Sequence, residues 1–121
     1  NPDMGGTQRL TRVVGPSQAK RLIFTADTID AQEAARIGLV DILVEPDKLL
    51  EEAFKMAEKI ASMPPYAIRF AKKAVNIAMD APLEVGLMYE EAGSTFCMGT
   101  EDKTEAVNSI LEKRQPKFHG R

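Results

Sequence analysis

Residues 39–44 are the only stretch of this chain with the pattern of a β-strand, and they constrain the fold more than any other feature. The run Leu39-Val40-Asp41-Ile42-Leu43-Val44 alternates and is rich in β-branched side chains. A lone strand leaves its backbone N–H and C=O groups without partners, and the 121 residues contain no second convincing strand. We therefore expect the partner strands to come from earlier sequence or from another chain. Because the chain starts within a Pro-Asp-x-Gly-Gly turn, we favour earlier sequence and expect a fragment of a longer protein.

From residue 46 onward the apolar residues repeat at helical spacing. An amphipathic stripe runs from Leu50 to Ala61, and Met63-Pro64-Pro65 ends it because neither proline can continue a preceding helix. A helix rich in small residues follows. Asp80-Ala81-Pro82 and then Thr100 open two more, each with residues suited to a helix start. The sequence thus predicts four consecutive helices.

Residues 1–45 form a different, mixed piece. Gly5-Gly6-Thr7 begins a short helix with Thr7 as its cap, and Gly15-Pro16 should stop that helix before a second begins. Asp30 and Glu33 have the spacing of a capping box, which predicts a third helix ending near Gly38. The predicted fold class is a mainly α fragment with one short strand, divided into residues 1–45 and 46–121.

Composition excludes several classes of protein. With 16 basic and 18 acidic residues, the chain has no strong field for nucleic acid, and its basic tail from Lys113 to Arg121 has one aromatic residue. No apolar stretch is long enough to span a bilayer. The single cysteine, Cys97, allows no internal disulfide and favours a reducing compartment. One histidine, His119, lies in a tail expected to be exposed, too far from Cys97 for a metal site. We expect no membrane or nucleic-acid partner.

An ordered series of residues resembles the enoyl-CoA hydratase/isomerase (crotonase) family, C-terminal portion only. The family's Pro-Gly-x-Gly-Gly-Thr-Gln-Arg-Leu segment is similar to residues 2–10, except that Asp3 stands in place of glycine. The resemblance continues, with family-like spacing, through essentially the whole chain: Arg12, Gly15, Ala19, Leu22, Thr25, Ile29, Ala31, Glu33-Ala34, Gly38-Leu39-Val40, Lys72-Lys73 and Glu112-Lys113-Arg114-x-Pro116-x-Phe118.

This resemblance implies a fold and an assembly. The family fold is a spiral of β-β-α turns, followed by helices that build a trimer, often paired into a hexamer. Residues 1–45 would then be the end of the spiral and residues 46–121 the C-terminal helical oligomerisation region of an α/β parent. The resemblance also implies a cytoplasmic protein, or one of the mitochondrial matrix if the source is a eukaryote.

The resemblance implies a reaction as well. The family binds acyl-CoA thioesters, with coenzyme A as part of the substrate and no separate cofactor. Two backbone N–H groups stabilise an enolate, and in hydratases two glutamates position and deprotonate water. These groups precede the Pro2-Asp3 turn in the family. We therefore expect a C-terminal part of an enoyl-CoA hydratase, inactive by itself.

Asp3 is the main departure from the hydratase pattern. In relatives such as dienoyl-CoA isomerases an aspartate at this position is a base or nucleophile, so Asp3 is a candidate catalytic residue. The alternative is structural: the carboxylate accepts hydrogen bonds from the N–H groups of Gly5 and Gly6 in an Asx-type turn. The parent could accordingly be an enoyl-CoA or dienoyl-CoA isomerase that uses Asp3, or the chain could be a catalytically inert oligomerisation module.

Four residues are candidates for contact with the substrate. Gly5 and Gly6 lack the lysine of a phosphate loop, so tight backbone packing beside the substrate is the favoured interpretation. Lys113 resembles the family lysine that reaches the phosphates of coenzyme A, although it could instead complement its own helix terminus. Ile110 stands where many hydratases have an aromatic residue against the adenine. No metal ligands are expected.

Overall fold

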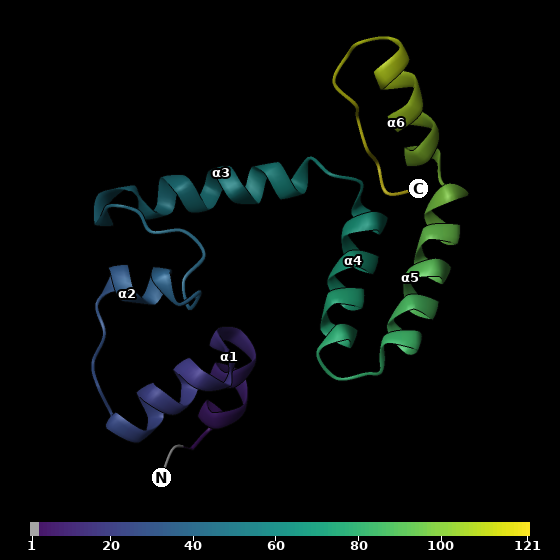
Figure 1. Ribbon diagram of the computed structural model, residues 1–121. Helices are drawn as coiled ribbons and strands as arrows, with labels where there is room; N and C mark the ends of the chain where they lie inside the picture. The colour runs from purple at the N-terminus through teal and green to yellow at the C-terminus, as the bar shows by residue number, and fades with distance from the viewer. Residues whose placement is uncertain (1–2) are drawn as a thin grey trace. The chain divides into compact units, whose positions relative to one another are not determined.

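A computed structural model describes residues 3–121, which divide into two compact units with the boundary between Leu49 and Leu50. The order of elements is α1, α2, a short 3₁₀ helix η1, and then α3 to α6. The six α-helices are labelled in Figure 1. No strand occurs among these residues. The mainly α prediction is confirmed.

The first unit begins with α1 (Gly6–Thr25), which is two helical segments joined at a kink. Gly15 has φ 78° and ψ 163°, a conformation outside the helical range, and Pro16 starts the next segment. The predicted break at Gly15-Pro16 is therefore confirmed. The predicted cap at Thr7 is wrong: Gly5 occupies the N-cap position, and Thr7 lies inside the helix, where its carbonyl accepts the Thr11 hydroxyl at 2.6 Å.

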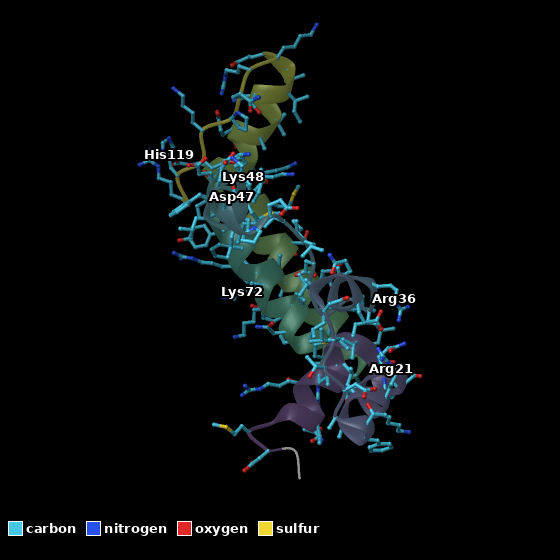
Figure 2. The ribbon with its side chains drawn as sticks, turned by 90° about the vertical axis from the view of Figure 1, so that its left-hand side faces the viewer. Arg21, Arg36, Asp47, Lys48, Lys72 and His119 are labelled. Carbon is cyan, nitrogen blue, oxygen red and sulfur yellow. The ribbon has the colours of Figure 1, made fainter. Side chains whose placement is uncertain are left out.

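Helix α2 (Ala31–Arg36) starts where the capping pattern predicted. The Asp30 carboxylate accepts the N–H of Glu33 at 2.8 Å. Glu33 also joins the two helices, because it pairs with Arg21 of α1 at 2.6 Å and with Arg36 of α2 at 2.5 Å. Both arginines are labelled near each other in Figure 2. The hydrogen bond from Arg36 is the main reason that the pKa of Glu33 is lowered.

The predicted strand at residues 39–44 is wrong. The N–H groups of Leu39 and Val40 donate to the carbonyl of Ala34 at 2.9 and 3.3 Å, so they close the end of α2 instead of joining a sheet. Ile42 and Leu43 beyond them are 59% and 45% exposed. The alternating pattern is present, but among residues 3–121 no other segment provides a strand to pair with it.

After η1 (Pro46–Lys48), four helices follow in the order the sequence predicted: α3 (Leu49–Ala61), α4 (Pro65–Ala78), α5 (Leu83–Met98) and α6 (Glu101–Leu111). Pro65 is the first residue of α4, and Pro82 is the N-cap residue of α5. Thr100 caps α6 by accepting the N–H of Lys103 at 3.3 Å. The predicted breaks therefore lie at prolines and at a hydroxyl cap.

Helices α4 and α5 pack side by side as a hairpin (Figure 1). Phe70 lies at the centre of the contact, with its ring centroid 6.0 Å from that of Tyr89 and 5.3 Å from that of Phe96. Gly93 is buried against it. A Cβ at Gly93 would lie only 2.8 Å from Phe70 Cδ1, so this glycine permits the close approach of the helices.

The chain then turns back along α6. Figure 1 shows the segment after α6 running from the end of that helix toward its beginning. There the backbone oxygen of Arg121 accepts the N–H groups of Glu101 and Asp102 at 2.7 and 3.2 Å. These are two of the N–H groups that a helix leaves without internal partners at its start. The tail thus completes the start of α6.

Many apolar side chains remain exposed, especially on α3, where Leu50 and Phe54 are 71% and 64% exposed. The buried hydrophobic residues of the described chain are few, Ala19 and Ala34 among them. Such surfaces are typical of chains that pack against another part of a protein or another copy. Among the described residues, no helix combines the length and apolar character needed to cross a bilayer.

Candidate functional site

Two groups of predicted site residues lie in two different units. Asp3, Gly5 and Gly6 form the turn before α1, whereas Ile110 and Lys113 lie at the end of α6.

The turn before α1 is tight and held by backbone bonds. The carbonyl of Asp3 accepts the N–H of Gly6 at 3.1 Å, and Gly5 has φ +83°, a left-handed conformation that favours glycine. A Cβ at Gly5 would lie 3.3 Å from Nε of Arg9. Gly5 is thus suited to a close backbone turn, and the packing of Gly5 and Gly6 beside the substrate stays a prediction.

The carboxylate of Asp3 is exposed, and it accepts the N–H of Met4 at 2.6 Å. This differs from the predicted Asx-type turn, since the N–H of Gly6 donates to the backbone carbonyl of Asp3. The carboxylate is therefore accessible at the start of a helix. Its role in catalysis stays a prediction.

Helix α6 ends in a Schellman motif centred on Lys113. The N–H of Lys113 donates to the carbonyl of Ile110 at 3.2 Å, and the N–H of Arg114 donates to that of Ser109 at 3.0 Å. Lys113 has φ +54° and is exposed. The Ile110 side chain is 77% exposed, so both predicted coenzyme A contacts lie on the surface of this unit.

Glu105 connects this turn to the tail. Its two carboxylate oxygens accept hydrogen bonds from the Arg114 guanidinium at 2.5 and 2.8 Å, and one of them accepts the N–H of Lys117 at 2.7 Å. The bond from Arg114, followed by the bond from Lys117, lowers the pKa of Glu105 from 4.5 to about 2. Glu112 also pairs with Arg114, at 2.5 Å, and the two glutamates together raise the pKa of Arg114.

Acidic pH is expected to weaken this attachment. The folded pKa of Glu105 lies below its ordinary value of 4.5, so its contribution to stability is complete above that pH and is lost as the pH falls toward about 2. Thermal midpoints of the protein and its Glu105→Gln variant, measured from about pH 7 to about pH 3, should therefore converge in acid. A constant difference between the two would contradict this role of Glu105.

Asp102 holds the rest of the tail. Its side chain is almost fully buried, and it accepts the N–H groups of His119 and Gly120 at 2.7 and 2.9 Å. The His119 side chain is exposed as predicted, and it is labelled in Figure 2. The backbone of this tail is nevertheless fixed, which the sequence analysis missed. No local pattern indicates it, because Asp102 and His119 are 17 residues apart in the sequence.

A pocket of about 590 Å³ lies between α6 and the tail. Its walls combine carboxylates with basic side chains: Glu101, Asp102, Thr104, Glu105, Asn108, Arg114, Gln115, Lys117 and His119. Glu105 and Asp102 are already bonded to the tail. We therefore interpret the residues that line this pocket as contacts that hold the tail against α6. Within residues 3–121 no group of three His, Cys, Asp or Glu side chains could hold a metal ion.

Comparison with known proteins identifies the family of this chain. The family model of enoyl-CoA hydratase/isomerase matches residues 1–121. The chain belongs to the enoyl-CoA hydratase/isomerase family. It is 45% identical over 114 residues to a short-chain-enoyl-CoA hydratase of Clostridium acetobutylicum, covering 94% of this chain and 44% of that protein. It is 44% identical over 117 residues to a crotonyl-CoA hydratase of Syntrophomonas wolfei, covering 97% of this chain and 45% of that protein.

The fold agrees with a solved member of the family. A crystal structure of enoyl-CoA hydratase from Bacillus anthracis matches with a TM-score of 0.94 and 42% sequence identity, covering 99% of this chain and 46% of that one. The chain therefore spans somewhat less than half the length of these relatives. This is consistent with the C-terminal helical part of the crotonase fold.

Proposed function

We propose that this chain is the C-terminal part of an enoyl-CoA hydratase, which adds water across the double bond of 2-enoyl-CoA. The observation that carries the proposal is the identity of 45% and 44% to a short-chain-enoyl-CoA hydratase and a crotonyl-CoA hydratase, over nearly all of this chain. A short acyl chain is the substrate class that these two names favour. The protein would be cytoplasmic, or in the mitochondrial matrix of a eukaryote, and would assemble as a trimer or hexamer.

In this proposal the catalytic groups belong to the rest of the protein, and this chain contributes contacts to the substrate. Backbone N–H donors stabilise the enolate and two glutamates handle water, and both would come from residues outside this chain. The turn at Asp3–Gly6 would lie beside the acyl group. Gly5 has no side chain to occupy space there, and its left-handed conformation suits the turn. The hydrogen bond from the N–H of Gly6 to the carbonyl of Asp3 fixes the course of the backbone.

Lys113 and Ile110 would contact coenzyme A. An exposed ammonium at a fixed helix end supplies a point charge for a phosphate, and an exposed apolar side chain one turn earlier offers a surface for the adenine. Replacing Lys113 with alanine is expected to raise the KM for crotonyl-CoA by about 5-fold, as for an exposed charge contact worth roughly 1 kcal/mol. Steady-state kinetics on the whole protein would measure this change. An unchanged KM would remove Lys113 from the coenzyme A site.

The proposed reaction itself is tested on the whole protein that carries this chain. Hydration of crotonyl-CoA is expected, followed as loss of the absorbance of the conjugated thioester and confirmed by detection of 3-hydroxybutyryl-CoA. A protein that binds acyl-CoA but leaves crotonyl-CoA unchanged would refute the hydratase proposal.

The accessible carboxylate of Asp3 favours a second candidate, an enoyl-CoA or dienoyl-CoA isomerase in which Asp3 moves a proton between carbons. The Asp3→Asn variant distinguishes the hydratase from the isomerase. Hydration should survive this change if Asp3 has only a structural role, whereas isomerisation of a 3-enoyl-CoA or dienoyl-CoA should be lost if Asp3 is the base.

Exposed apolar side chains favour a third candidate, an inert oligomerisation module. The exposed residues on α3 and α5 include Leu50, Phe54, Leu83 and Met88. If this chain acts only in assembly, the isolated chain should self-associate in analytical ultracentrifugation and show no binding of acyl-CoA. Binding of acyl-CoA would exclude this candidate.

A further inference from the structure

The same helix-ending turn occurs at the ends of α2 and α6, with different residues at its central position. At the end of α2, Gly38 has φ +77°, and the N–H groups of Gly38 and Leu39 donate to the carbonyls of Ala35 and Ala34 at 3.1 and 2.9 Å. At the end of α6, Lys113 occupies the position of Gly38, with φ +54°. Glycine is the usual residue here because it has no Cβ to strain the left-handed conformation.

A lysine at this position needs support from its surroundings. Left-handed backbone is unfavourable for a residue with a Cβ, and it persists where neighbouring contacts determine it. The adjacent residue supplies such contacts, since the guanidinium of Arg114 donates to both carboxylate oxygens of Glu105 at 2.5 and 2.8 Å. Glu105 also binds the N–H of Lys117 on the far side of the turn. The carboxylate of Glu105 on α6 therefore binds the chain at two residues that follow Lys113, namely Arg114 and Lys117.

The same contacts leave the lysine available. The Glu112 carboxylate, next to Lys113 in the chain, is engaged by Arg114 Nε at 2.5 Å. Arg114 thus forms ion pairs with two glutamates near the turn, Glu105 and Glu112. Lys113 is exposed beside them. Both of these carboxylates are therefore paired with Arg114.

We propose that Glu105 is a positioning residue for substrate binding: through Arg114 it fixes the left-handed turn that presents Lys113 to the phosphates of coenzyme A. The proposal rests on the assignment of Lys113 in the proposed function. Glu105 does not touch the substrate in this scheme. It holds the backbone from which the Lys113 side chain extends, so its loss should weaken recognition of the phosphates and leave the acyl half of the site unaffected.

The test compares two ligands on the whole protein. Coenzyme A carries the phosphates and adenosine, whereas pantetheine lacks them, so the ratio of their dissociation constants in titration calorimetry reports the Lys113 contact. Crotonyl thioesters of both give the corresponding ratio of KM values. Glu105→Gln is expected to weaken CoA relative to pantetheine by about 3-fold and Lys113→Ala by about 5-fold. The double variant should show no more than the effect of Lys113→Ala, because the two residues act through one contact.

Two further variants separate positioning from stability. Lys113→Gly should lower the selectivity for CoA as Lys113→Ala does, while its thermal midpoint stays equal or rises, because glycine suits the left-handed turn. Glu101→Gln is the matched control: Glu101 is on the same helix, exposed, and pairs with Arg121 at 2.9 Å. Glu101→Gln should leave the ratio of the dissociation constants of CoA and pantetheine unchanged.

The outcomes distinguish this proposal from the proposed function. If Lys113→Ala lowers the selectivity for CoA and Glu105→Gln does not, positioning by Glu105 is refuted while the coenzyme A contact stands. If Lys113→Ala has no effect, the contact and its positioning are both refuted. If the protein binds CoA with the expected ratios but does not hydrate crotonyl-CoA, the hydratase proposal fails and the positioning of Lys113 is supported.

Discussion

Replacing Asp102 with alanine is expected to release residues 119–121 from α6, whereas the N–H of Lys117 stays bonded to Glu105. The buried carboxylate accepts two backbone N–H groups, from His119 at 2.7 Å and from Gly120 at 2.9 Å. Truncation removes both bonds, and each donor left unsatisfied costs about 1–3 kcal/mol unless the tail moves into water. The tail should therefore open. Hydrogen exchange of the tail amides, measured by mass spectrometry on the whole protein, should become faster by at least about 10-fold.

The residue before Asp102 provides the control. Glu101 is also acidic and also pairs with the tail, but the side chains of Glu101 and Arg121 are 72% and 70% exposed. Such a surface ion pair contributes roughly 0–1 kcal/mol, so Glu101→Ala should leave tail exchange nearly unchanged. Asp102→Asn retains one acceptor oxygen, so its rate of tail exchange should lie between the rates of Asp102→Ala and Glu101→Ala. Equal protection in Asp102→Ala and in the unmodified protein would show that Asp102 does not hold the tail.

Replacing Gly93 with alanine is expected to destabilise the α4–α5 hairpin, although alanine is ordinarily the better helix residue. The new Cβ would lie 2.8 Å from Cδ1, 3.0 Å from Cγ and 3.2 Å from Cβ of Phe70. Rotation about χ2 moves Cδ1 and rotation about χ1 moves Cγ, so a new rotamer of Phe70 can relieve the first two contacts. It cannot relieve the third, because Cβ of Phe70 is fixed to the backbone, and the helices must move apart. Overpacking of this kind costs about 1–3 kcal/mol, more than the 0.5–1 kcal/mol or so that alanine gains over glycine in a helix.

The control for this prediction lies on the same helix. A Cβ at Gly86 would meet no atom within 4 Å, so Gly86→Ala should stabilise the protein by about 0.5–1 kcal/mol. The two glycine-to-alanine changes should thus shift the denaturant midpoint in opposite directions. If Gly93→Ala proves as stable as Gly86→Ala, the close contact between Gly93 and Phe70 does not limit the packing of the helices.

The helices were predictable where local chemistry determines them. The carboxylate cap at Asp30, the prolines at the starts of α4 and α5, and the hydroxyl cap at Thr100 all act within a few residues of the helix end. Residues 39–44 show the limit of such patterns. Their alternation favours a strand, but strand formation depends on a partner, and the described chain has none.

The candidate site was predictable in part. The family resemblance directed attention to Asp3 and Lys113, and the turns that hold them are now described. The tail contacts were not predictable, because Asp102 and His119 are 17 residues apart and no local pattern joins them. The left-handed Lys113 was not predictable either, since propensity places glycine at that position.

The return of the tail to the start of α6 also gives an order to events during synthesis. Asp102 and the first N–H groups of α6 leave the ribosome before His119, Gly120 and Arg121, which supply their partners. Until those residues emerge, the buried carboxylate has only water to bind, and the helix start lacks two of its acceptors. Closing a loop of this length is fast once both ends exist, on the order of 10–100 ns for a 10-residue loop. Such closure is far faster than synthesis, which adds about 5–20 residues per second, so the tail can bind α6 as soon as it emerges.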